Sequence, residues 1–321
     1  MARSGDVGGY VVRRLALVVP TLVGLTMLAF GVANVAPGDP AAEYLRRVYG
    51  REPTPSELQV ERDRLGLDRP LVEQYVRWVG RATQGDLGTS FTSRRSVRAE
   101  LLHRIPFTLE LAIPAALLAL VVAVPTGIAS AVHRNRFLDQ ALRVASLAGA
   151  SMPSFWLALL LIILFAVHWS LVPVAGRAGL TSLLLPTVTL ALAPTAVLAR
   201  FTRSAMLETL GEDYVTVARS KGVREWMIVG RHALRNALIP IVTAFATSLG
   251  FLLSGAVVIE TIFVWPGVGS LIVEAIQARD YPMIQGFVLY TGAAFLVINL
   301  LVDLSYLVID PRVAITAGEA P

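Results

Sequence analysis

The stretch EDYVTVARSKG, residues 212–222, interrupts a chain in which 55% of the residues are hydrophobic. It carries two acids, one Arg and the only Lys of the sequence, and it ends on Gly222. Gly222 suits the left-handed conformation that ends many helices, and Asp213 is expected to cap the N-terminus. Helical spacing places four residues on one face: Tyr214, Val217, Ala218 and Lys221. The pattern predicts a short, charged helix between two apolar segments.

The composition around this stretch is that of a membrane protein. Only 16% of the 321 residues are charged, whereas about a quarter are charged in soluble domains. Several apolar runs reach the roughly 20 residues that a helix needs to cross a bilayer, and they do not alternate at period two as a β-barrel would. We therefore expect an all-α polytopic membrane protein. Its six transmembrane helices are expected near Leu15–Ala36, Leu109–Val132, Leu138–Val167, Ser182–Phe201, Leu238–Val264 and Met283–Ile309.

A polar segment, residues 37–106, separates the first apolar run from the second. Thr54-Pro55-Ser56-Glu57 has the pattern of a capping box with proline at the first helical position, and Gly66 ends the helix that follows. Four later residues fall on one helical face: Leu71, Tyr75, Trp78 and Ala82. The segment is expected to form a small helical region outside the bilayer.

The short connections between the apolar runs give an orientation. Those near 133–143 and 202–236 are rich in Arg, whereas the alternate connections carry only Arg177 and Arg279. Positive charge in short loops marks the cytoplasmic side. The N-terminus, both Arg-rich connections and the C-terminus are therefore expected in the cytoplasm.

Two features of the expected helices have more than one interpretation. Small residues recur at spacing four at 141, 145 and 149 and at 191, 195 and 199, which permits close helix contacts, although Ala and Gly are common in such helices anyway.

Three acids lie in or near the spans: Glu110, Glu260 and Asp303. Acids there mark pathways for substrates or protons. An interfacial or helix–helix hydrogen bond is the favoured alternative for Glu110 and Glu260, and both interpretations stay open for Asp303.

Motifs for chemistry within the chain are missing from the sequence. It has no cysteine, its four histidines show no metal-ligand spacing, and it has neither a Walker A loop nor a G-x-S-x-G elbow. We expect no enzymatic activity, no metal site and no cofactor in this chain. The net charge of +5 is attributed to topology and contact with membrane lipid, and not to nucleic-acid binding.

The protruding helix suits docking into a groove of another protein, although an ordinary interfacial helix would show a similar pattern. The longer stretch YVTVARSKGVREWMIVGRHALRNALIPIVT, residues 214–243, resembles the cytoplasmic coupling loop of ABC importer permeases, most closely in the dipeptide/oligopeptide/nickel subfamily. Ala218, Gly222 and Leu234 match the general importer pattern. The departures at Thr216, Val217, His232 and Arg235 are those of the peptide-type subfamily. Further stretches that resemble this subfamily are 13–24, 36–40, 85–90, 260–286 and 299–312.

The resemblance implies a type I ABC importer permease fold in the bacterial inner membrane. It divides the chain into a cytoplasmic N-terminus with the first helix (1–36), an external helical segment (37–106), a five-helix transmembrane domain (107–309) with a coupling loop at about 205–236, and a cytoplasmic tail (310–321). It also implies four partners: a second homologous permease, two cytoplasmic ABC ATPases that bind ATP and Mg, and an external substrate-binding protein. The segments 41–106 and 265–282 would receive the binding protein.

The resemblance also assigns roles to residues of the coupling loop. Tyr214, Val217, Ala218 and Gly222 would dock on the ATPase, next to the expected cap Asp213. Arg219, Lys221 and Arg224 would make polar contacts to the ATPase or to lipid. The cargo would be di- or oligopeptides or a related small solute, with nickel and glutathione as alternatives. From the residues alone, a proton-coupled secondary transporter is the alternative from another class, and Asp303 would then be its coupling residue.

Overall fold

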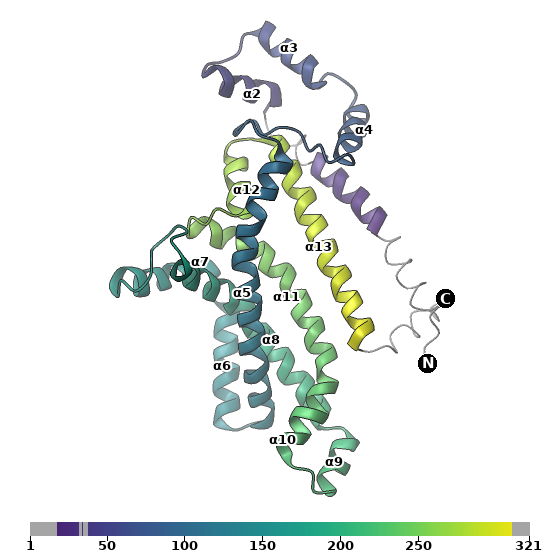
Figure 1. Cartoon of the computed structure of the whole chain (residues 1–321), viewed down its shortest axis with the longest axis vertical. Coiled ribbons are helices and arrows are strands. Elements are labelled where there is room, and N and C mark those ends of the chain that lie inside the picture. Colours follow the sequence, from purple (N-terminus) through teal and green to yellow (C-terminus); the bar gives the residue numbers. More distant parts are fainter. Residues whose placement is uncertain (1–17, 32–33, 35–37, 310–321) are drawn as a thin grey trace. The chain divides into compact units, whose positions relative to one another are not determined.

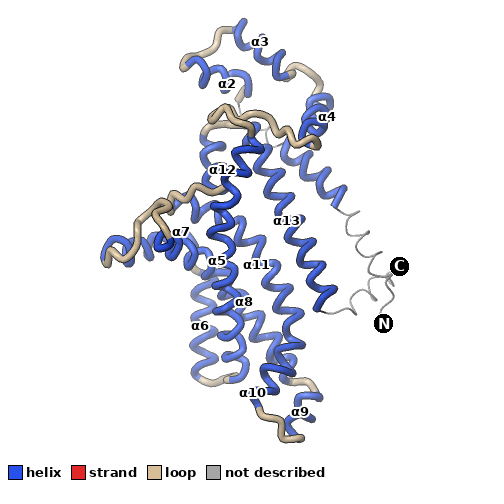
Figure 2. Tube along the Cα trace, in the orientation of Figure 1, coloured by secondary structure: helices blue, strands red, loops and turns tan. Residues whose placement is uncertain are grey.

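The computed structural model describes residues 18–31, 34 and 38–309, with side chains up to residue 300. Apart from an isolated bridge between Thr89 and Ser96, all regular structure in these residues is helical (Figures 1 and 2). An apolar helix, Val18–Gly31, comes first. The α-helices that follow are α2 (Pro40–Tyr49), α3 (Pro55–Leu65), α4 (Leu71–Ala82), α5 (Val97–Val132), α6 (Phe137–Ser151), α7 (Ser154–Leu161), α8 (Leu184–Leu210), α9 (Asp213–Ser220), α10 (Glu225–Met227), α11 (Leu234–Ile262), α12 (Val268–Gln277) and α13 (Tyr281–Ile309). Two π-helical segments, η1 (Ile162–His168) and η3 (Ile228–Ala233), and a 3₁₀ turn, η2 (Leu180–Leu183), adjoin them.

Four helical segments are long and apolar enough to cross a membrane: Val97–Val132, Leu180–Leu210, Glu225–Ile262 and Tyr281–Leu300. A fifth span is present if the bent pair formed by α6 and the α7–η1 segment counts as one. These segments overlap five of the six expected runs. The remaining run, Leu15–Ala36, lies partly outside the described residues, and its described part is the helix Val18–Gly31.

The expected span over Leu138–Val167 is not one straight helix. The chain bends by 101° between Ser151 and Ser154. Pro153 lacks the N–H that a continuing helix would use, and its ring pushes the preceding residue toward extended backbone. Met152 accordingly has φ −80° and ψ 121°, and Pro153 becomes the N-cap of α7.

The chain divides into two compact units, each described here by itself. The first unit consists mainly of residues 108–265, and α8 lies at its centre. This helix packs on α6, α7 and α11, and the α8–α11 contact is the most extensive. A buried core forms where these helices meet α5, and it includes Leu198, Met206 and Ile241.

Small residues allow the close approach of helices in this first unit. Gly127 of α5 lies so close to α8 that an added Cβ would stand 2.5 Å from Thr202 Cβ and 2.7 Å from the Ala199 carbonyl oxygen. Gly149 of α6 is buried and faces Ala196 and Leu192 of α8. The α8 stripe is packed, with Ala191 and Ala199 buried, whereas Ala141 and Ala145 of the α6 stripe are exposed.

The second unit consists of residues 11–107 and 266–297. Helix α3 begins at the expected capping box, in which Thr54 accepts from the Glu57 backbone and Glu57 from the Thr54 backbone, and it ends at Gly66 with φ +72°. Hydrogen bonds from the Arg51 side chain and the Thr54 backbone lower the pKa of Glu57 to about 2. In α4, Trp78 is buried, and Phe30 packs against Tyr75 and Trp78.

Two distant stretches of sequence meet within the second unit. The buried carboxylate of Asp280 accepts hydrogen bonds from the Ser90 hydroxyl and the Thr92 backbone. The ring of Phe91 packs edge-on against Tyr44 at 5.4 Å, and Arg47 donates to the Ala278 carbonyl. These contacts tie the region of α2 and the loop before α5 to the corner between α12 and α13.

The Gly127 contact gives a test of the packing in the first unit. We expect Gly127→Ala to destabilise the protein, because overpacking costs about 1–3 kcal/mol and the neighbouring carbonyl cannot move without shifting α8. Gly80→Ala is the matched control, since Gly80 is helical and has no atom within 4 Å of an added Cβ. The melting temperature in detergent is expected to fall for Gly127→Ala only. Equal melting of the two variants would show that α5 and α8 do not approach this closely.

Candidate functional site

The protruding helix expected near residues 212–222 is α9, and its C-terminus has the geometry of a Schellman motif. Gly222 has φ +75°. The Val223 N–H donates to the Ala218 carbonyl at 3.2 Å, and the Gly222 N–H donates to the Arg219 carbonyl at 2.9 Å. This is the pairing that a left-handed residue after a helix allows. The expected role of Gly222 as the helix terminator is confirmed.

The start of α9 differs from the expectation. Asp213 was expected to be the cap, but Glu212 occupies that position and no side chain caps the helix. Asp213 instead lies in the first turn, where a negative charge interacts favourably with the helix dipole. The sequence has adjacent acids here, and their order alone did not decide which one precedes the first helical residue.

Three contacts hold α9 on the helices that flank it. Val215 is fully buried. The Asn236 amide donates to the Tyr214 hydroxyl at 2.8 Å, and Arg219 forms a two-pronged pair with Glu225, with N–O distances of 2.6 and 3.2 Å. Arg219 was expected to contact a partner or lipid, and it makes this internal pair. Val215 could have been anticipated, because it is an apolar residue outside the expected docking face, whereas no local signal pointed to Asn236.

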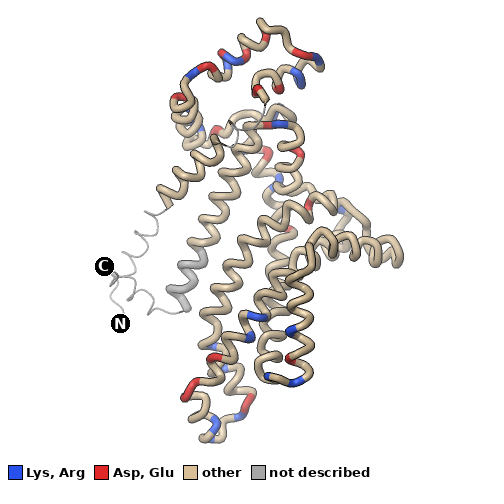
Figure 3. The backbone as a smooth tube through the Cα atoms, turned by 180° about the vertical axis from the view of Figure 1, so that it is seen from behind, with Lys and Arg blue, Asp and Glu red and all other residues tan. Residues whose placement is uncertain are grey.

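The face of α9 expected to dock is partly open. Tyr214 and Val217 are 39% and 50% exposed, Lys221 is exposed, and Ala218 is half-buried. Trp226 of α10 is also exposed, at 67%. Within the first unit, many charged residues lie at the end formed by α9, α10 and the α5–α6 turn (Figure 3). This end therefore carries exposed apolar residues together with charged residues.

The segment after α9 runs into the next long helix without interruption, as expected. Helix α10 passes into the π-helical segment η3 and then into α11. Ile228 and Ala233, at the two ends of η3, are fully buried. Single π turns within helices occur often at functional sites. The surface of α9 and α10 is thus joined directly to a span that extends to Ile262.

A buried ion pair lies near the same end of the first unit, and sequence reasoning did not identify it. Arg203 of α8 donates to both carboxylate oxygens of Asp139 in α6, each at 2.8 Å, and Asp139 is fully buried. The Ser130 hydroxyl of α5 and the Asn135 N–H also donate to this carboxylate. Asp139 is the only acid in the Arg-rich stretch 133–143, which was the available signal. The pair fixes the α5–α6 turn to the helix that leads into α9.

The three acids near the spans have different environments. Glu260 is fully buried and accepts a hydrogen bond of 2.7 Å from Thr108, which joins α11 to α5. Glu110 pairs with Arg177 at 2.9 Å on an exposed surface. These contacts are of the hydrogen-bonding kind favoured for both residues, and a role in a pathway stays a prediction. The side chain of Asp303 lies outside the described residues.

Comparison with family models gives two matches that together extend over most of the chain. Residues 123–315 match the model described as "Binding-protein-dependent transport system inner membrane component". Residues 8–112 match the model described as "Binding-prot-dependent transport system membrane comp, N-term". The first match includes α9, η3 and both partners of the buried ion pair.

Several curated proteins are similar over nearly their full length. The dipeptide transport system permease protein DppB of Escherichia coli K12 is 39% identical over 336 residues, which cover 95% of this chain and 98% of that protein. The di/tripeptide permease DppB of Pseudomonas aeruginosa is 40% identical, with the same coverage. The glutathione permease GsiC of E. coli K12 is 41% identical over 304 residues, again covering 95% and 98%.

A solved structure gives the same fold. An inward-facing form of the MetNI methionine ABC transporter matches with a TM-score of 0.52 and 18% identity, over 65% of this chain and 95% of that chain. At this sequence identity the match shows similarity of fold alone. The resemblance that the sequence motifs indicated is confirmed by the family models and the curated relatives.

The buried ion pair gives a test with a matched control on the same helix. We expect Arg203→Gln to destabilise the protein by about 3 kcal/mol, because it leaves the buried carboxylate of Asp139 without its countercharge. Arg200→Gln, one turn earlier and without an acidic partner among the described residues, is expected to change stability by less than about 0.5 kcal/mol. Thermal unfolding in detergent measures both. Similar melting of the two variants would show that the pair is not formed.

Proposed function

Because the chain belongs to the family of binding-protein-dependent transport system inner membrane components, we propose that it is one permease of an ATP-driven importer. It pairs with a second, homologous permease, and the two form the membrane pathway. Two cytoplasmic ATPases bind ATP and Mg and supply the energy, and an external binding protein delivers the solute. This chain does not hydrolyse ATP. The open apolar face of α9, joined to two long helices, is the observation that carries the proposal.

In this proposal α9 is the coupling helix. Tyr214, Val217 and Ala218 dock in a groove of the ATPase, with Lys221 and Arg224 at the rim. Exposed apolar side chains on a helix support this assignment, because Tyr214 and Val217 remain open, as helix-in-groove contacts require. Arg219 also pairs with Glu225 and so braces α9 against α10, and its contact with the ATPase or with lipid stays part of the proposal.

The internal contacts suggest how movement of α9 passes into the membrane. Three features hold α9 on the start of the following span. They are the buried side chain of Val215, the Asn236–Tyr214 hydrogen bond and the Arg219–Glu225 ion pair. On its other side α9 follows α8 directly, and α8 carries Arg203, whose pair with Asp139 reaches the α5–α6 turn. Elements linked in this way move together, so a shift of the coupling helix changes the arrangement of the spans as a rigid-body step.

The orientation and the domain division follow the same proposal. The Arg-rich end with α9 faces the cytoplasm, together with both termini, and six helices cross the membrane. The external helical segment, 37–106, then lies outside. The binding protein docks on segments 41–106 and 265–282. In support, contacts within the second unit join parts of these two segments, through Arg47 and Ala278 and through Ser90 and Asp280.

The proposed cargo is a di- or oligopeptide or a related small solute. The relatives are named for dipeptides, for di- and tripeptides and for glutathione, which is itself a tripeptide. Nickel transport is the alternative within the class. In such systems the external binding protein supplies most of the selectivity. The relatives of this chain therefore support peptides as the class of cargo, and they do not identify one particular peptide.

Purification and reconstitution test this proposal. A gentle affinity purification of the chain from its native membrane is expected to recover two P-loop ATPases, a sister permease and a binding protein, and the ligand of that protein names the cargo. In proteoliposomes the complex is expected to accumulate peptide only with ATP. Uptake by the chain alone, driven by a proton gradient without ATP, would contradict the importer and favour the secondary transporter.

Substitution of Gly222 tests whether α9 couples ATP hydrolysis to transport. A β-branched residue in the left-handed conformation costs about 1–2 kcal/mol, so Gly222→Val is expected to displace the end of α9 and to abolish most substrate-stimulated ATP hydrolysis and uptake in the assembled complex. Gly222→Asn is the matched variant, because Asn tolerates this conformation, and no atom lies within 4 Å of an added Cβ. It is expected to retain coupling. Full activity of Gly222→Val in an intact complex would refute the role of this helix end.

A further inference from the structure

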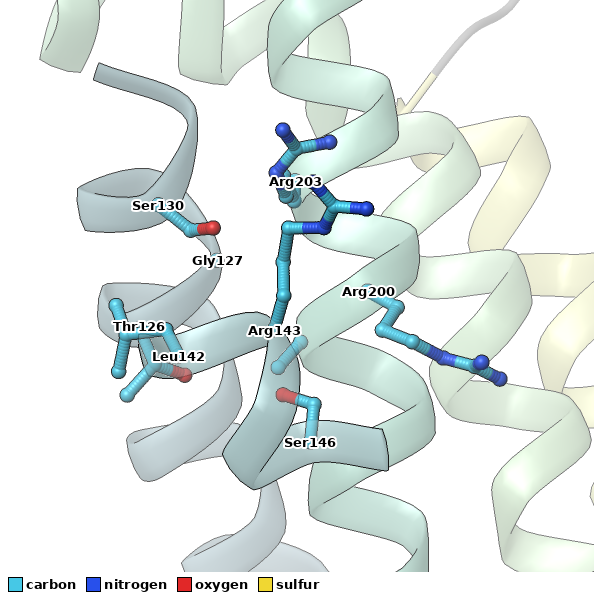
Figure 4. Close-up of a pocket in the computed structure, with 9 residues that line it drawn as sticks. Thr126, Gly127, Ser130, Leu142, Arg143, Ser146, Arg200 and Arg203 are labelled. Atoms are coloured by element: carbon cyan, nitrogen blue, oxygen red, sulfur yellow. The ribbon is translucent and has the colours of Figure 1, made fainter. Parts of the chain in front are cut away.

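A small pocket opens between α5, α6 and α8, next to the buried ion pair (Figure 4). Helix α5 contributes hydroxyl groups, α6 a serine and an arginine, and α8 two arginines. The lining residues are Thr126, Gly127, Ser130, Leu142, Arg143, Ser146, Ala199, Arg200 and Arg203. Three of the nine lining residues are therefore arginines and three carry hydroxyl groups.

The charges around the pocket are not balanced by the protein. Arg203 is neutralised by Asp139. Neither Arg143 nor Arg200 has an acidic side chain within 4 Å among the described residues, and both are exposed. In Figure 4 the guanidinium groups of Arg143 and Arg203 lie next to each other, while Arg200 extends along the edge. Two positive charges are therefore left without an acidic partner in the protein, and such charges attract an anion.

The helices that line the pocket also carry exposed apolar residues. Val144 and Leu147 on α6 are 67% and 58% exposed, and Phe201 on α8 is 54% exposed. These residues neighbour Arg143 and Arg200 in the sequence of the same helices.

We propose that this pocket binds the phosphate group of an anionic membrane lipid. Arg143 and Arg200 donate to the phosphate oxygens, since guanidinium groups bind phosphate with paired donors, and Ser146 supplies a further hydroxyl. The acyl chains lie along Val144, Leu147 and Phe201. Basic pockets between membrane helices bind anionic headgroups in this way. Free inorganic phosphate offers the same oxygens but no acyl chains, so the exposed apolar residues favour the lipid.

Native mass spectrometry of the full chain in detergent tests the proposal, with phosphatidylglycerol titrated as the probe. Each arginine near a membrane surface contributes about 1 kcal/mol, so Arg143→Gln/Arg200→Gln is expected to weaken phosphatidylglycerol binding by about 30-fold. Arg143→Lys/Arg200→Lys keeps both charges and is expected to retain most of the binding. Phosphatidylcholine, which has no net charge, is expected to bind weakly to all variants.

Arg231→Gln/Arg235→Gln is the matched control, because both residues are exposed and lie outside the pocket. Unchanged phosphatidylglycerol binding in this control supports the assignment to the pocket. An equal loss in the control and the pocket variant would overturn it, as would unchanged binding in the pocket variant. Competition by inorganic phosphate with the same arginine dependence would assign the site to free phosphate and overturn the lipid.

Discussion

The buried pair between Asp139 and Arg203 is the interaction on which the organisation of the first unit depends. A carboxylate with no exposed surface is stable in a helix bundle only if its charge is compensated, and Arg203 supplies both donors. The pair fixes the α5–α6 turn to α8. Because α8 ends at Leu210, just before α9, the same contact sets where the protruding helix begins.

Local patterns in the sequence predicted local structure well. The capping box at Thr54 and Glu57 and the terminator at Gly222 depend on a few neighbouring residues, and both are present. The family and the membrane class followed from long apolar runs and from an extended motif. Asp213 shows the limit of this reasoning, because adjacent acids compete for the cap and their order does not reveal the helix start.

The features that the sequence did not predict depend on contacts between residues far apart in the chain or on the direction of a helix. Asp139 and Arg203 are 64 residues apart, so their pairing exists only once α6 packs on α8. The bend at Pro153 turned one expected span into two helices, because hydropathy reports burial in lipid and not the direction of a helix. The acid Glu260 appears in the sequence as a charge inside a span, and its partner Thr108 lies on another helix.

The central claim is that the exposed face of α9 docks on the ATPase, and site-directed photo-crosslinking tests it most directly. The chain has no cysteine, so Val217→Cys can be labelled at this single position of the purified chain with a benzophenone maleimide before it is assembled with its partners. Val144→Cys on α6, which is also exposed, serves as the control. The expected result is a crosslink to the ATPase from position 217 and none from position 144. Crosslinks from position 217 to lipid or to other membrane subunits alone would contradict the account.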